Sequence, residues 1–90
     1  MTHYISNYTI VAGSPHVLIN HVTTIDDDGR LVCIKPFVAE QRATLYVDRP
    51  VAVVPAGFNA AALPHDLRDA ARLLAALPSP TGKPVDIVKL

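Results

Sequence analysis

A change of hydrophobic period near residue 59 limits most strongly what this 90-residue chain can fold into. Before it, apolar and polar residues alternate in short segments separated by Gly, Pro and Asp, which is typical of β-strands. Residues 59–77 are instead rich in Ala and Leu and follow the helical period. A last alternating segment closes the chain. The pattern therefore predicts a mostly β domain with one helix, of the α+β class.

The segment boundaries follow from the turn residues between them. We predict strands at 4–12, 16–25, 30–37, 43–48, 51–54 and 85–90, a loop at 38–42, and the helix within 59–77. The wholly apolar segment 51–54 is expected to be buried on both faces. The expected architecture is a small antiparallel-rich β-sandwich or sheet with a single helix near the C-terminus, forming one domain over residues 1–90.

Strict alternation assigns the side chains of each strand to two faces. In the second strand, one face carries Val17, Ile19, His21, Thr23 and Ile25, and the other carries His16, Leu18, Asn20, Val22 and Thr24. In the third strand, Leu31, Cys33 and Lys35 oppose Val32 and Ile34.

The helix has an apolar stripe, with Pro64 suited to its first turn and Asp66 complementing its positive N-terminus. The stripe consists of Leu67, Ala70, Ala71, Leu74 and Leu77.

Composition limits the partners of the chain. Eight basic residues balance eight acidic ones, which disfavours nucleic acid and an anionic membrane surface as partners. Half of the residues are hydrophobic, more than so small a domain can bury, so we expect a homo-oligomer or a protein partner. Cys33 is the only cysteine, and the N-terminal residues do not resemble a signal peptide. These features predict a cytoplasmic protein.

The acidic run Asp26-Asp27-Asp28 is the most conspicuous polar motif, and Gly29 follows it. A calcium loop counted from Asp26 would need ligands at its fifth and twelfth positions, which are Arg30 and Phe37. The motif therefore predicts a hairpin turn, since Asp-Gly favours the backbone of such turns.

The spacing of possible ligands and nucleophiles predicts no catalytic, cofactor-binding or metal-binding residue. The four histidines (His3, His16, His21 and His65) form no His-x-His or His-x-x-x-His pair, although a cluster assembled in space or across an oligomer axis stays open. His16 and His21 would point to opposite faces of a regular strand. Cys33 lies in mid-strand among apolar residues, where cysteine usually acts as a small hydrophobe.

Other candidate residues have simpler interpretations. Ser6, Ser14 and Ser79 lack a nucleophile elbow, and the adjacency of His65 and Asp66 in sequence is no sign of a triad. The isolated glycines, Gly13 and Gly57, do not form a phosphate-binding loop, and the three tyrosines, Tyr4, Tyr8 and Tyr46, are interpreted as sheet residues.

Several short motifs, taken in order, resemble the small β-sandwich domain that flanks the metal-binding barrel of the amidohydrolase superfamily. They are Tyr8-Thr9-Ile10-Val11, Val17-Leu18-Ile19, Asp27-Asp28-Gly29-Arg30-Leu31-Val32, Val51-Ala52-Val53-Val54-Pro55-Ala56-Gly57-Phe58-Asn59 and Pro80-Thr81-Gly82-Lys83-Pro84-Val85-Asp86-Ile87-Val88. The resemblance covers residues 4–59 and 80–90. Where the family has its metal-binding His-x-His, this chain has Ala60-Ala61-Ala62-Leu63, and a helix replaces the whole barrel. The resemblance thus implies the sandwich without its enzyme, with the helix on the surface that the barrel would cover.

The leading hypothesis is a non-catalytic β-rich domain that acts by self-association or by binding a partner protein. An alternative is a small-molecule- or metal-binding protein, with hydrolase relatives, whose site lies at a subunit interface or between sheet and helix. Its candidate residues are His16, His21 and the turn at 26–28. A third hypothesis is a domain split from an enzyme, which complements a separate barrel chain in trans.

Overall fold

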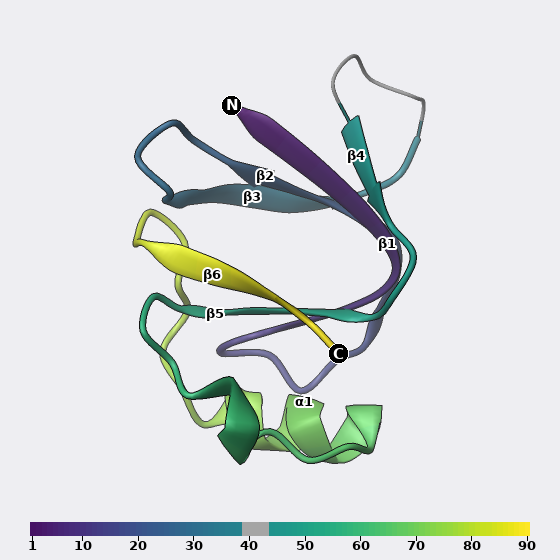
Figure 1. The fold of residues 1–90 in the computed structure, drawn as a ribbon, viewed down its shortest axis with the longest axis vertical. Coiled ribbons are helices and arrows are strands. Elements are labelled where there is room, and N and C mark those ends of the chain that lie inside the picture. Colours follow the sequence, from purple (N-terminus) through teal and green to yellow (C-terminus); the bar gives the residue numbers. More distant parts are fainter. Residues whose placement is uncertain (39–43) are drawn as a thin grey trace.

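The computed structural model describes residues 1–38 and 44–90, and its elements follow the predicted order. The strands are β1 (Thr2–Val11), β2 (Leu18–Ile25), β3 (Leu31–Pro36), β4 (Thr44–Val47), β5 (Val51–Pro55) and β6 (Val85–Lys89). A 3₁₀ turn, η1 (Ala60–Ala62), and a single α-helix, α1 (Leu67–Ala75), lie between β5 and β6 in the described residues (Figure 1). The predicted α+β class is confirmed. The predicted loop after Val38 and the predicted first residue of the fourth strand, Ala43, lie outside the described residues.

All of these strands belong to one mixed sheet. The order is β3-β2-β1-β5-β6, and β4 also pairs with β1. Pairing is antiparallel between β1 and β2, β2 and β3, and β5 and β6, and parallel between β1 and either β4 or β5. β1 is long enough to use the same edge twice: His3–Ser6 pair with β4, and Thr9–Val11 pair with β5.

The sheet bends where β1 changes partner. Between the pairs Ser6–Val47 and Thr9–Val51, β1 has two residues and the opposing chain has three, so the opposing chain carries a bulge. The buried Ser6 hydroxyl donates to the backbone carbonyl of Arg49 at 2.7 Å. A carbonyl that the bulge removes from the ladder thus keeps a hydrogen-bond partner.

The predicted faces of β2 are wrong across Asn20. Asn20 has a φ of 53°, a left-handed conformation that breaks the strand's alternation. As a result Leu18 and Ile25, predicted on opposite faces, pack in the same apolar cluster. His16 lies before β2, so strand alternation does not relate it to His21.

The predicted faces of β3 are also wrong, for a similar reason. The β2–β3 register shifts between Thr24–Cys33 and Ile25–Leu31, which leaves Val32 as an extra residue. Leu31 and Ile34, predicted on opposite faces, therefore contact the same cluster. Cys33 and Lys35 lie on the other side, in a surface groove.

Two apolar clusters use the two sides of the sheet. The inner cluster lies within the curve of the sheet and consists of Val11, Ile25, Leu31, Val53 and Val85. The helix cluster lies between the sheet and α1 and consists of Ile10, Ala52, Val54, Ala70, Ala71 and Leu74. Neighbouring residues of β5 contribute to different clusters, and residues 51–54 are all buried, which confirms the predicted double-sided burial of this segment.

The two edges of the sheet meet at one end of the molecule. Leu31 N donates to Lys83 O at 3.0 Å, Gly82 N donates to Leu31 O at 2.8 Å, and Val85 N donates to Gly29 O at 3.0 Å. These bonds hold the start of β3 against the start of β6. The sheet therefore curls, so that β2 and β3 form one layer above β5 and β6, with α1 beneath the second layer (Figure 1).

The predicted helical stripe and the predicted position of Asp66 at the helix N-terminus are confirmed, but Pro64 does not lie in the first turn. Ala70, Ala71 and Leu74 are fully buried against the sheet. α1 begins after Asp66, whose carboxylate accepts the backbone N–H groups of residues 68 and 69. Pro64 lies before this N-cap residue and is therefore outside the first turn of the helix.

Gly13 connects β1 to the end of α1. Its N–H donates to Leu74 O at 2.9 Å, its φ is +86°, and a Cβ here would lie 3.0 Å from backbone atoms of Ser79. Gly57 offers a matched comparison, because its φ is +83° but a Cβ would meet nothing within 4 Å. The two glycines thus share a backbone constraint and differ in the available space.

We predict that Gly13→Ala destabilises the fold more than Gly57→Ala. Both changes place a side chain in left-handed backbone, at a cost of about 1–2 kcal/mol. Gly13→Ala adds the clash with Ser79 and should lose about 1–3 kcal/mol more. Urea unfolding followed by circular dichroism measures both free energies. Equal losses in the two variants would contradict the close packing of Gly13 against the backbone of Ser79, in the loop after α1.

Candidate functional site

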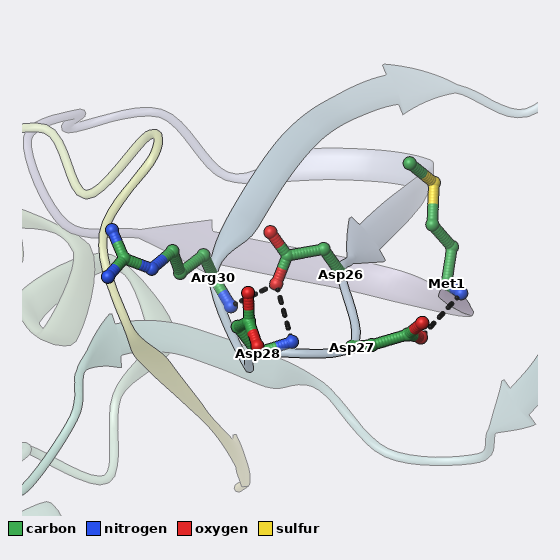
Figure 2. Close-up of polar contacts among 5 residues, drawn as sticks. All are labelled: Met1, Asp26, Asp27, Asp28 and Arg30. Atoms are coloured by element: carbon green, nitrogen blue, oxygen red, sulfur yellow. Dashed lines mark hydrogen bonds and ion pairs between the residues drawn. The ribbon is translucent and has the colours of Figure 1, made fainter.

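The acidic run forms the predicted hairpin turn between β2 and β3. Gly29 N donates to Asp26 O at 3.0 Å, and Gly29 has a φ of +78°. Asp26 Oδ1 accepts the backbone N–H groups of Asp28 and Arg30, each at 2.9 Å (Figure 2). One carboxylate is thus used to hold the turn, which is the usual role of Asp at such a position.

The neighbouring carboxylates do not converge on a common point. Asp27 Oδ1 forms an ion pair with the Met1 ammonium at 2.9 Å, on the other side of the turn from Arg30 (Figure 2). The Asp27 side chain is 93% exposed, so this pair contributes little stability. Within residues 1–38 and 44–90, no group of three His, Cys, Asp or Glu side chains is placed to hold a metal ion.

The histidines lie apart and two of them have structural partners. His3 Nδ1 lies 2.8 Å from Thr24 Oγ1, and His21 Nδ1 lies 2.9 Å from the carbonyl of Ile19. His16 lies before β2 and His65 before α1. The structure thus brings no two of them together within one strand.

Ser6 and Ser14 form hydrogen bonds with the backbone, and Ser79 contacts another side chain. Ser6 bonds the Arg49 carbonyl, Ser14 Oγ accepts the backbone N–H of His16 at 3.3 Å, and Ser79 Oγ lies 3.3 Å from Thr81 Oγ1. In the part of the chain that the structure describes, no serine hydroxyl is hydrogen-bonded to a histidine ring. A serine nucleophile activated by an adjacent base needs that contact.

A row of side chains across three strands is the first of two candidate sites. Cys33 on β3 is opposite Thr24 on β2, and Thr24 is opposite His3 on β1. The row lies in a groove of about 400 Å³, which we call the thiol groove. Its lining is Met1, His3, Val22, Thr24, Val32, Cys33, Lys35, Pro36 and Val38.

The geometry of the thiol groove does not pair its thiol with its imidazole. The central threonine accepts or donates the hydrogen bond to the His3 ring and is itself buried. Cys33 is half-buried and forms no side-chain hydrogen bond with any described residue. Cys33 and His3 lie on strands that are separated by β2. Across two strand spacings, their Cα atoms are about 9–10 Å apart. The groove therefore contains a half-buried thiol that is not hydrogen-bonded to the His3 imidazole.

A second groove of about 550 Å³ lies where α1 meets the outer side of β1 and β2. Tyr8 and Ile19 are opposite each other in the β1–β2 pair and are 44% and 62% exposed. Leu67 and Val17 continue this apolar surface, and both also contact the helix cluster. The charged rim consists of Asp66 and Arg68. We call this second groove the helix groove.

The sequence did not predict either groove. The residues of the thiol groove come from three strands, and strand register cannot be read from a single alternating pattern when bulges intervene. All three tyrosines lie in strands, as predicted, but the sequence did not indicate that Tyr8 would be exposed beside α1. The nearest signal in the sequence was Asp66, which marked the start of the helix and thus one side of the helix groove.

Comparison with protein-family models, with curated proteins and with solved structures gave no significant match. No helix in residues 1–38 and 44–90 has the length and hydropathy needed to span a bilayer.

We predict that Cys33 reacts with iodoacetamide at a rate independent of His3. His3→Gln should change the rate by less than about twofold, because the imidazole is not bonded to the thiol. The rates are measured between pH 6 and 9, with Cys33→Ser as the blank. A drop of about tenfold in His3→Gln at pH 7 would instead identify a Cys–His pair.

Proposed function

We propose that this chain is a non-catalytic domain that acts by self-association or by binding a partner protein. The observation that carries the proposal is the one-sided cover of the sheet. α1 packs on the β5 side, over Ile10, Ala52 and Val54. The outer side of β2 and β3 has no such cover among the described elements, and apolar side chains are exposed along the strands.

The exposed apolar residues are numerous for a chain of this size. Ile19 and Tyr46 are 62% and 64% exposed, although both lie within strands. Others are Tyr8, Val32, Phe37, Val38, Leu45 and Leu73. Exposed apolar surface that extends over several elements is characteristic of protein contacts, and zero net charge gives little repulsion between copies.

The polar groups support a non-catalytic role because structural bonds occupy them. Asp26 holds the hairpin, Asp66 caps α1, Ser6 bonds a bulge carbonyl and His3 bonds Thr24. A catalytic site would require several such groups to converge on one point in a pocket. A cytoplasmic location is part of this proposal and is supported by the single, free cysteine.

We also retain the resemblance to the amidohydrolase sandwich as a proposal about origin. It is supported by the way the two similar parts, 4–59 and 80–90, meet: β6 returns to pair with β5 along its whole length. The inserted helix lies on an outer side of the sheet, over β5. Under this proposal, α1 occupies surface that a barrel would otherwise cover.

We predict that the purified protein is a metal-free oligomer. Light scattering across a concentration series gives the mass, and elemental analysis of the same peak gives the metal content. A mass of two or more chains would support self-association. A monomer carrying stoichiometric zinc or iron would contradict the proposal and favour the alternative, a metal-binding protein with His3, His16, His21 and His65 as candidate ligands.

We predict further that the chain does not require a separate barrel chain for stability. Co-purification under native conditions from its own cells, followed by mass spectrometry, tests this. Stoichiometric recovery of an amidohydrolase-like barrel would support complementation in trans instead. A stable, monodisperse homo-oligomer would exclude the split enzyme as the main form of the protein.

A further inference from the structure

The helix groove combines an apolar floor with two opposite charges that have no ion-pair partner among the described residues. Asp66 and Arg68 both line it. Farther along α1, Asp69 and Arg72 lie 3.9 Å apart as an i,i+3 pair. Asp66 and Arg68 are two residues apart, a spacing at which side chains on a helix do not face each other. Their charges are therefore available to a partner.

The carboxylate of Asp66 retains capacity beyond its role at the helix start. Oδ1 accepts the N–H groups of residues 68 and 69, at 3.0 and 3.1 Å. An ionised carboxylate has two oxygens, so Oδ2 can accept a bond from a guanidinium. Arg68 is exposed and can reach outward.

We propose that the helix groove is the contact between two copies of this chain, related by a two-fold axis. This proposal rests on the self-association proposed above. In a two-fold contact, residue i of one copy meets residue j of the other, and j meets i. Arg68 of each copy then pairs with Asp66 of the other, around a centre formed by Tyr8 and Ile19.

Charge complementarity favours a second copy over an unrelated partner. A surface carrying one free positive and one free negative charge is complementary to itself under two-fold symmetry. A partner with a strong charge of one sign would attract one of these two groups and repel the other. The exposed tyrosine and isoleucine supply the apolar centre, and tyrosine is a frequent anchor of such contacts.

The size of the chain is compatible with this contact. A stable interface covers about 800 Å² on each partner. The described chain exposes 5546 Å², so such a contact would take about one seventh of it. It would extend from the groove along the exposed residues of β1 and β2.

The test compares three groove variants with matched controls by sedimentation velocity. Ile19→Lys should shift the equilibrium toward monomer by about tenfold or more, because it places a charge in the apolar centre. Arg68→Gln and Asp66→Asn should each weaken the dimer and reduce its sensitivity to salt, since they remove the reciprocal pairs. Asn caps a helix as well as Asp, so Asp66→Asn keeps α1 intact.

The controls are Arg72→Gln on the same helix and Val32→Lys in the thiol groove. Both should associate as the unmodified chain does, and circular dichroism confirms that every variant is folded. If the unmodified chain associates and only Val32→Lys dissociates it, the helix groove is not the contact, while self-association stands. If the unmodified chain is a monomer at all concentrations, both self-association and this contact are overturned.

Discussion

The bend of β1 is the constraint on which the rest of the structure depends. One strand serves two layers: its first half lies between β2 and β4, and its second half continues beside β5. β1 can pass from one layer to the other for two reasons. The Ser6 hydroxyl donates a hydrogen bond to the carbonyl of Arg49 at the bulge, and Asn20 adopts a left-handed conformation opposite the bend. Without this bend, the sheet could not curl over an inner cluster, and a 90-residue chain would have one flat apolar face to bury.

Much of the fold could be predicted because the relevant signals are local. The Asp-Gly hairpin, the apolar run at 51–54 and the helical stripe each depend on the chemistry of neighbouring residues, and each is confirmed. The strand faces failed at Asn20 and Val32, where a single residue leaves the period of two. A bulge is decided by what the strand must pack against, and that information is not in the strand itself. Pro64 was expected in the first helical turn, but the helix begins after Asp66, because the Asp66 carboxylate caps the N–H groups of residues 68 and 69.

The candidate sites were less predictable than the fold. The sequence places Cys33, Thr24 and His3 far apart, and only the registers of the β1–β2 pair and of the bulged β2–β3 pair align them. The helix groove joins residues of β1, β2 and α1, and its two charges have meaning only once Asp69 and Arg72 are seen to pair with each other. The sequence did predict that excess apolar surface would remain, because composition alone determines how much a small domain must expose.

The length of α1 explains why this surface remains exposed. A helix of nine residues is about 14 Å long, whereas a strand of ten residues spans about 33 Å. The curled sheet has outer surface on both of its layers, and one short helix can cover part of one. Extending the helix would require apolar residues beyond Leu77, where Pro78 stands instead. The fold therefore completes its inner cluster but leaves part of its exterior uncovered, and the second copy that we propose at the helix groove would cover some of that exterior.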